Sequence, residues 1–324
     1  MFSTKRLVFN ALTFIPGATT LPVVKHKLQK RSLGTGGTLR ARYCYAVWLR
    51  HLVHAYKNGL NCDPKRVAEL GPGDSIGIGL AAVLTGAQQY YAFDVVEHAN
   101  INRNLQVLDE LCELFASRAP VPGPEEFPAV KPGIDSYDFP DHILSDARLD
   151  ACLDAARIER IRHGVKNVSS PGSMVQYRAP WDRDATVEAN SIDMVFSQAV
   201  LEHVDDLHRV YDYMHRWLHS DGFVSHLIDF KCHDSAREWN GHWAHSETMW
   251  HLVRGKDVWL INREPHSTHL RLLREYGFEV IEDTVFEMAS NLKRDQLASR
   301  FKHLTDADLR TTEAFIQAKK VAMH

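Results

Sequence analysis

One stretch, residues 66–95, constrains the fold of this chain more than any other: RVAELGPGDSIGIGLAAVLTGAQQYYAFDV. We expect an apolar strand over 67–70, a Gly-Pro-Gly turn, a helix of small residues over 76–84, and a second strand that ends at Asp94. This order is half of a nucleotide-binding βαβ unit. It therefore predicts an α/β protein built on a parallel sheet.

The turn itself narrows the ligand class. Gly71 and Gly73 let the backbone approach a ligand closely, and Asp94 is placed to accept hydrogen bonds from ribose hydroxyls. The dinucleotide fingerprint G-x-G-x-x-G fails, because its last glycine is replaced by Ile76. Glu69 would repel a pyrophosphate but could hold the ammonium group of an amino acid. A ligand with an adenosine end and an amino-acid end therefore fits better than NAD.

The run Glu69-Leu-Gly71-Pro72-Gly73-Asp-Ser75 resembles the first motif, E/D-x-G-x-G-x-G, of the class I S-adenosylmethionine-dependent methyltransferases, with serine in place of the third glycine. The resemblance implies a Rossmann-like, mostly parallel sheet of seven strands with helices on both faces. It also implies S-adenosylmethionine as the cofactor.

A second run, SIDMVFSQAVLEHVDDLHRVYDYMHRWLHSDGFVSHLIDF, resembles the fourth and fifth motifs of that family. We expect a strand over 192–197, a helix over 205–219, an Asp-Gly turn, and a strand that ends at Asp229 or Phe230. A short strand over 174–178 precedes this run. Where it ends, the family places an adenine contact; here Asp182 is the nearest acid, or Trp181 stacks on the base. The cofactor residues implied by the resemblance are Glu69, Gly71, Pro72, Gly73, Ser75, Asp94, Val95, Pro180, Trp181, Ser197 and Gln198.

The remaining organisation follows from composition shifts. We expect a helical N-terminal cover over 1–62, with a helix over 41–59, and a methyltransferase domain over 63–324 with insertions at 118–165 and 230–265. A helix over 268–276, a strand over 278–286 and a polar helix-forming stretch precede the last strand, 311–321. In the family this last strand is antiparallel and lies between the fifth and sixth.

Composition excludes several classes of protein. A net charge of −3 gives no general attraction to nucleic acid. Five scattered cysteines and no apolar run of 18 residues favour a cytoplasmic protein without a membrane span. The basic residues 1–38 are expected to form an amphipathic helix that packs on the domain or rests weakly on a membrane surface, rather than a signal peptide. Oligomeric state is not predicted.

Methyl transfer to a poor nucleophile such as a sugar hydroxyl needs a base. His203 is the candidate, the alternative being a histidine that holds loop backbone. Asp229 either orients a histidine, binds a substrate hydroxyl, or caps the next element. A divalent metal at His226, Asp229, His233, His242 and His245 stays open but is not favoured, because these spacings match no ligand motif.

The acceptor is expected to lie against the segment 231–265, which is dense in histidine and tryptophan. Eleven of the 19 histidines fall between 203 and 269, which favours a polar acceptor pocket. The candidate substrate-binding residues are Tyr43, His233, Asn240, His242, Trp243 and Arg263. Their alternatives are ordinary packing: Tyr43 in a helix that covers the sheet, and the tryptophans in a core of the segment itself.

These observations predict O-methylation of a polar small molecule, such as a sugar in a glycan or polysaccharide pathway. Alternatives are another small acceptor, such as a phenol or an acid, and a non-catalytic nucleotide-binding or scaffold protein with the same fold. An NAD-dependent oxidoreductase ranks third because of Glu69 and Ile76.

Overall fold

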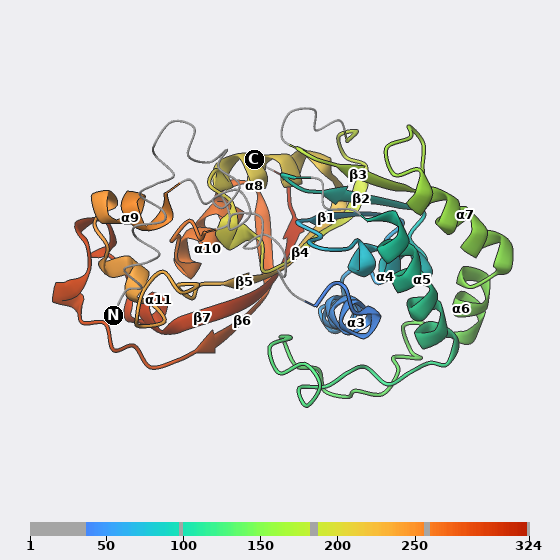
Figure 1. Cartoon of the computed structure of the whole chain (residues 1–324), viewed down its shortest axis with the longest axis horizontal. Helices are drawn as coiled ribbons and strands as arrows, with labels where there is room; N and C mark the ends of the chain where they lie inside the picture. Colours follow the sequence, from blue (N-terminus) through green and yellow to red (C-terminus); the bar gives the residue numbers. More distant parts are fainter. Residues whose placement is uncertain (1–36, 97–99, 182–186, 256–259, 323–324) are drawn as a thin grey trace.

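The sheet has seven strands in the order β3-β2-β1-β4-β5-β7-β6 (Figure 1). The computed structural model describes residues 37–96, 100–181, 187–255 and 260–322. Its strands are β1 (Arg66–Leu70), β2 (Gln89–Phe93), β3 (Val175–Arg178), β4 (Ile192–Gln198), β5 (Leu218–Asp229), β6 (Phe278–Glu287) and β7 (Thr311–Lys320). All neighbours pair in parallel except β7, which is antiparallel to both β5 and β6. The predicted Rossmann-like fold is confirmed, including the last strand between the fifth and sixth.

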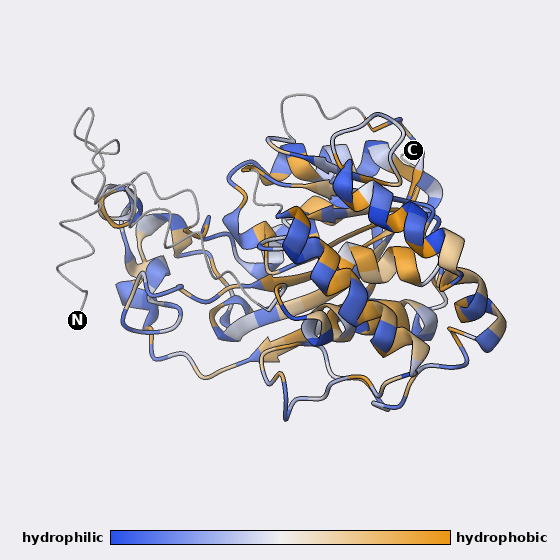
Figure 2. Cartoon of the chain, turned by 45° about the vertical axis from the view of Figure 1, so that its right-hand side comes forward, coloured by the Kyte–Doolittle hydropathy of each residue, from blue (hydrophilic) through white to orange (hydrophobic). Residues whose placement is uncertain are grey.

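Helices cover both faces of this sheet, and Figure 2 shows hydrophobic residues gathered where helices meet strands. On one face, α3 (Ala41–Lys57), α4 (Gly77–Leu84), α5 (Ile101–Ala116), α6 (Asp146–Cys152) and α7 (Ala155–Lys166) share one apolar core with the strands. On the other face, α8 (Leu207–Trp217) and α10 (His266–Glu275) share the second core. The short helices α9 (Glu247–Arg254) and α11 (Asp306–Arg310) lie beyond the sheet, beside two smaller clusters.

Close packing of α4 on the sheet explains its small residues. A Cβ atom at Gly79 would lie 1.9 Å from Cζ of Tyr90 on β2, so only glycine lets the helix approach this closely. In β1, residues 67–70 are all buried, as expected for a central parallel strand covered on both faces.

Polar bonds as well as apolar contacts attach α3 to the sheet. Nδ1 of His51 lies 2.7 Å from Oγ of Ser225 on β5, and Nδ1 of His54 lies 2.8 Å from Oε1 of Glu282 on β6. Asn58, at the end of the helix, donates to Oε1 of Gln317 on β7 at 2.9 Å. The predicted helix over 41–59 therefore covers strands that are distant in sequence. The amphipathic helix expected within 1–38 falls almost wholly outside the described residues.

Two local predictions differ from the structure. Asp221 and Gly222, expected as a turn, lie inside β5, where the pairing register with β4 shifts between Ile192 and Met194. The stretch before β7, expected to be helical, contains two 3₁₀ turns and only the five-residue helix α11. Within the described residues, no helix is long and apolar enough to cross a membrane.

Candidate active site

The carboxyl ends of β1, β2, β4 and β5 meet at one edge of the sheet, and the chain order reverses between β1 and β4. Ligands of open α/β sheets bind at such an edge. Gly71 and Gly73 follow β1 with φ of +62° and +74°, a region that side chains disfavour. A Cβ at Gly71 would lie 2.7 Å from both methyl carbons of Val200, so the turn also presses against the loop after β4.

The rest of this turn fits an amino-acid nucleoside ligand. Asp74 Oδ2 is buried and has no hydrogen-bond partner among the described residues, which leaves an acceptor beside the glycines. Ser75 is buried, where its hydroxyl donates to the carbonyl of Thr38 and accepts from the amide of Gly77 at 3.1 Å, so it fixes the start of α4. Pro72 is buried beside it. These features suit S-adenosylmethionine, which Asp94 and the glycine turn would hold.

The side chain of Glu69, which was predicted to hold an ammonium group, is only 1% exposed. Its carboxyl group accepts a hydrogen bond from the Tyr90 hydroxyl and is almost fully buried. Burial raises the pKa of Glu69 from 4.5 to about 8, although the bond from Tyr90 acts in the opposite direction. At neutral pH the group is therefore mainly protonated, and its role toward an ammonium group stays a prediction.

Asp94 is buried at the end of β2. Its Oδ1 accepts a hydrogen bond from the amide of Val95 at 2.7 Å, and its carbonyl accepts one from the amide of Trp181 at 3.1 Å. Val95 is half exposed. The ring of Trp181 packs against Phe93 and Trp217, so adenine stacking by Trp181 stays a prediction, as does any role of Pro180. Asp182 lies outside the described residues.

At the end of β4, Ser197 is fully buried and its Oγ lies 2.8 Å from Nδ1 of His226. Burial lowers the pKa of His226 to about 3, so this histidine is neutral and serves as a hydrogen-bond partner. Gln198 is half-buried at the strand end. The His51 ring of α3 packs against Phe196 of the same strand, with 5.5 Å between ring centroids, so α3 contacts the strand that ends at Ser197 and Gln198.

A second polar group lies where β4 and β5 end. After β4, a 3₁₀ turn over Leu201–His203 presents Glu202 and His203. After β5, Nε2 of His233 lies 3.3 Å from Oδ2 of Asp229, and its ring meets the His203 ring edge-on with 5.1 Å between centroids. Lys231 bridges Oδ2 of Asp229 at 3.1 Å and Oε1 of Glu313 at 2.8 Å.

Charge in this group is distributed unevenly. Burial raises the pKa of Asp229, but the hydrogen bond from His233 and the charge of Lys231 outweigh it and hold the pKa below 3.8. Burial, with the charge of Asp229, raises the pKa of Glu202 well above 4.5. The side chains of His203 and His233 are 26% and 30% exposed, so a solvent-borne acceptor can reach both.

The other predicted acceptor residues are spread through the 231–265 segment and α3. Asn240 is buried and donates to Oγ of Ser290 and the carbonyl of Leu309. Trp243 is fully buried in a small core with Leu297, Phe301, Leu304 and Leu309, and its Nε1 donates to the carbonyl of Arg263.

Arg263 is itself buried between the rings of Trp250 and Phe301 and pairs with Glu247 at 2.7 Å. His242 is buried beside Trp243. Tyr43 on α3 is half-buried and packs edge-on against Phe127. Only His233 of this set lies in the half-exposed group with His203 and Asp229, and acceptor binding by the others stays a prediction.

Sequence reasoning did not single out Glu202 or Asn262. Asn262 holds the 3₁₀ turn: its amide donates to the carbonyl of Glu202 at 2.6 Å, and its side chain donates to the carbonyls of Leu201 and Val204 at 2.8 and 2.7 Å. Glu202 adjoins His203 in the sequence, which was a usable signal. Its burial, and the contact with a segment 60 residues away, appear only in the fold.

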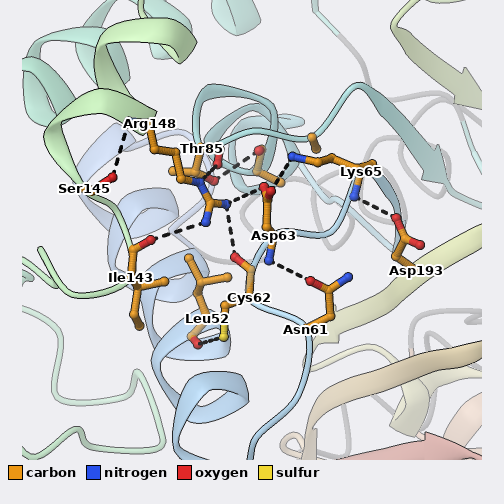
Figure 3. Close-up of polar contacts among 12 residues, drawn as sticks. Leu52, Asn61, Cys62, Asp63, Lys65, Thr85, Ile143, Ser145, Arg148 and Asp193 are labelled. Atoms are coloured by element: carbon orange, nitrogen blue, oxygen red, sulfur yellow. Dashed lines mark hydrogen bonds and ion pairs between the residues drawn. The ribbon is translucent and has the colours of Figure 1, made fainter.

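A cavity of about 230 Å³ lies away from this edge, before the amino ends of β1 and β2. Figure 3 shows polar contacts of the residues around it. Arg148 and Arg157 line it, but their guanidinium groups are engaged by the protein. Arg148 donates to carbonyls of Cys62, Thr85 and Ile143 and pairs with Asp63 at 2.9 Å. Arg157 donates to carbonyls of Val83 and Ala87, at the end of α4. We therefore interpret this cavity as structural.

Residues 151–225 match a family model described as a methyltransferase domain. No curated protein matches the chain. Solved structures similar to it include a methyltransferase from Methanosarcina mazei (13% identity, TM-score 0.44, covering 83% of this chain and 97% of that one). Another comes from Mesorhizobium loti (14%, 0.42, covering 82% and 96%). A third is Haemonchus contortus phosphoethanolamine N-methyltransferase 2 with S-adenosyl-L-methionine (15%, 0.42, covering 85% and 53%).

The similarity to these structures is too low to support a family assignment. That assignment depends on the matched family model and on features of this chain. The matched segment runs from α6 through β3 and β4 into β5 and includes the LEHV run. The glycine turn after β1 and the strand order complete the pattern. The family match, the glycine turn after β1 and the strand order together support a class I S-adenosylmethionine-dependent methyltransferase family for this chain.

Proposed function

We propose that this methyltransferase methylates a hydroxyl oxygen of a polar small molecule, such as a sugar in a glycan or polysaccharide pathway. The observation that carries the proposal is the half-exposed group His203, Asp229 and His233 at the ends of β4 and β5. A phenol or an apolar acid would need an apolar surface here. Charged and polar groups instead suit an acceptor with several hydroxyls.

The cofactor turn and this acceptor group are neighbours. A Cβ at Gly71 would lie 2.7 Å from the methyl carbons of Val200, and Val200 lies three residues before His203 in the same loop. A methyl group presented at the glycine turn therefore has the histidines on its acceptor side. This arrangement allows acceptor and methyl donor to be aligned, which supplies most of the rate enhancement in a displacement of this kind.

Residues of the chain remove the proton of the acceptor hydroxyl. S-adenosylmethionine supplies the methyl group on a sulfonium, and the acceptor oxygen forms the new C–O bond as the C–S bond breaks. His203 takes the hydroxyl proton, and Asp229 holds His233 in place beside it. As the acceptor product is a neutral ether, one proton is released for each methyl group transferred. A cytoplasmic location is part of the same proposal.

The test is formation of S-adenosylhomocysteine from S-adenosylmethionine with a panel of nucleotide sugars and free glycans. We expect turnover with at least one polyhydroxyl acceptor and a loss of about 100-fold in kcat for His203→Gln. His219→Gln, an exposed histidine on β5, is the matched control and should retain full activity. Cofactor binding without turnover on any acceptor would instead support the non-catalytic alternative. Turnover only on phenols or apolar acids would contradict the sugar assignment.

A further inference from the structure

Glu202 is a buried carboxyl group, 2% exposed. Among the residues that the structure describes, neither Oε1 nor Oε2 has a hydrogen-bond partner. Burying a carboxyl group without a hydrogen bond is costly, and a bound ion is one explanation for such a group. The backbone carbonyl of Glu202 is fixed by Asn262 at 2.6 Å, so the residue is held in position by a separate segment.

Two imidazoles stand beside this carboxyl group. Nε2 of His203 lies 4.0 Å from Oε1 of Glu202, and one ligand atom from each of Glu202, His203 and His233 falls within 4.8 Å of the other two. Ligand atoms about 2.0–2.2 Å from one ion stand roughly 3–4 Å apart. The ligand atoms therefore need to approach one another by at most about 1–2 Å around an ion.

The partner of His233 strengthens this assignment. Its Nε2 lies 3.3 Å from Oδ2 of Asp229, so one ring nitrogen of His233 faces a carboxylate. A metal-binding histidine ordinarily donates its other ring N–H to a carboxylate in this way. Lys231 and Glu313 in turn hold Asp229, so the second layer of contacts is already formed.

We propose that Glu202, His203 and His233 bind one divalent transition-metal ion at the acceptor side of the methyltransferase site. Two imidazoles and one carboxylate suit Zn²⁺, Fe²⁺ or Mn²⁺ better than Mg²⁺ or Ca²⁺, which prefer oxygen ligands. Three protein ligands leave coordination positions open. This set differs from the histidines considered from the sequence: His226 is fully buried on Ser197, and His242 lies beside Trp243.

The ion's role rests on the proposed function. The metal ion would bind two neighbouring hydroxyls of the acceptor and orient them. It would also lower the pKa of the reacting hydroxyl. His203 is then a ligand, and the coordinated hydroxyl gives its proton to solvent. The direct base role of His203 applies to the protein without an ion.

The test is titration of the full-length, chelator-treated protein with Co²⁺, followed by visible absorption. We expect one Co²⁺ per chain, with affinity reduced at least 100-fold in Glu202→Gln and in His233→Gln, and unchanged in His219→Gln. Thermal melts establish that each variant is folded, and calorimetry with S-adenosylhomocysteine follows the cofactor site independently.

Several results would overturn the inference. One is the absence of a Co²⁺ spectrum from folded protein that binds S-adenosylhomocysteine, which would leave the proposed function standing. A second is equal Co²⁺ affinity of Glu202→Gln and the unsubstituted protein. Turnover that persists in full after chelation would overturn the ion's role and assign the proton to His203. Specific Co²⁺ binding in a protein without methyl transfer would support the ion site and contradict the proposed function.

Discussion

Oδ2 of Asp229 lies 3.3 Å from Nε2 of His233, so the acid that ends β5 orients a histidine four residues later. Of the three roles that the sequence left open for Asp229, this contact favours the first. The amide of Lys231 also donates to Oδ1 of Asp229 at 2.8 Å, so the same side chain shapes the turn that carries His233.

We expect Asp229→Asn to reduce kcat at least tenfold, because the neutral amide holds the histidine in a different tautomer and leaves Lys231 with less compensating charge. Steady-state methyl transfer measures this. Asp221→Asn, on the same strand but exposed, is the control and should match the unsubstituted protein. A rate for Asp229→Asn equal to that of the control would show that this contact has no part in catalysis.

Gly71→Ala should abolish cofactor binding and destabilise the protein. Its Cβ would lie 2.7 Å from the Val200 methyl carbons at a φ of +62°, so both the turn and the loop after β4 must move. Gly59→Ala is a matched control, since Gly59 has a φ of +67° and nothing lies within 4 Å of its Cβ. That variant should lose only about 1 kcal/mol and still bind S-adenosylhomocysteine. Equal effects in the two variants would refute a special role for the turn after β1.

Glu69 makes stability depend on pH. Its pKa is about 8 in the folded protein and near 4.5 when exposed. The folded state therefore retains a proton that the unfolded state has lost. This contribution to stability is complete below pH 4.5 and declines as the pH rises to 8, by up to about 1.4 kcal/mol per pH unit.

In Glu69→Gln this decline should disappear. The free energy of unfolding of the variant, relative to that of the unsubstituted protein, should therefore increase from pH 5 to pH 8. Urea denaturation at three pH values measures the difference. A constant difference across this range would mean that Glu69 ionises normally in the folded protein.

Ser225→Ala tests how α3 is attached to the sheet. The change removes the hydroxyl that bonds His51 at 2.7 Å and Gln317 at 3.0 Å, both buried. We expect a loss of about 1–3 kcal/mol in the free energy of unfolding. Ser220→Ala, exposed on the same strand, should be nearly neutral. If both variants unfold at the same urea concentration, the Ser225 hydroxyl contributes nothing to the attachment of the helix.

The sequence predicts the sheet well because its strands are short apolar runs separated by clear turn residues. Periodicity places β1 and α4 within a residue or two, and the antiparallel last strand follows from the family resemblance. The Asp-Gly turn was predicted wrongly: Asp221 and Gly222 lie within β5, in the irregular stretch between Leu218 and Phe223, which pair with Ile192 and Met194.

The site was less predictable than the fold. His203, Asp229 and His233 could be selected because polar residues at strand ends gather at one edge. Glu202 adjoins His203, but its burial could not be predicted, because the bond that holds its backbone comes from Asn262, about 60 residues later. From the sequence, Trp243 could equally stack on a sugar ring or belong to a core. The structure packs it with Leu297 and Phe301 in a small apolar cluster.

The most direct test of the account is calorimetric titration of the purified protein with S-adenosylhomocysteine and, separately, with NAD, repeated on Asp94→Ala. We expect micromolar binding of S-adenosylhomocysteine, no binding of NAD, and at least tenfold weaker binding in the variant, because Asp94 ends β2 beside the glycine turn. Folded protein that binds NAD, or that does not bind S-adenosylhomocysteine, would contradict the methyltransferase assignment.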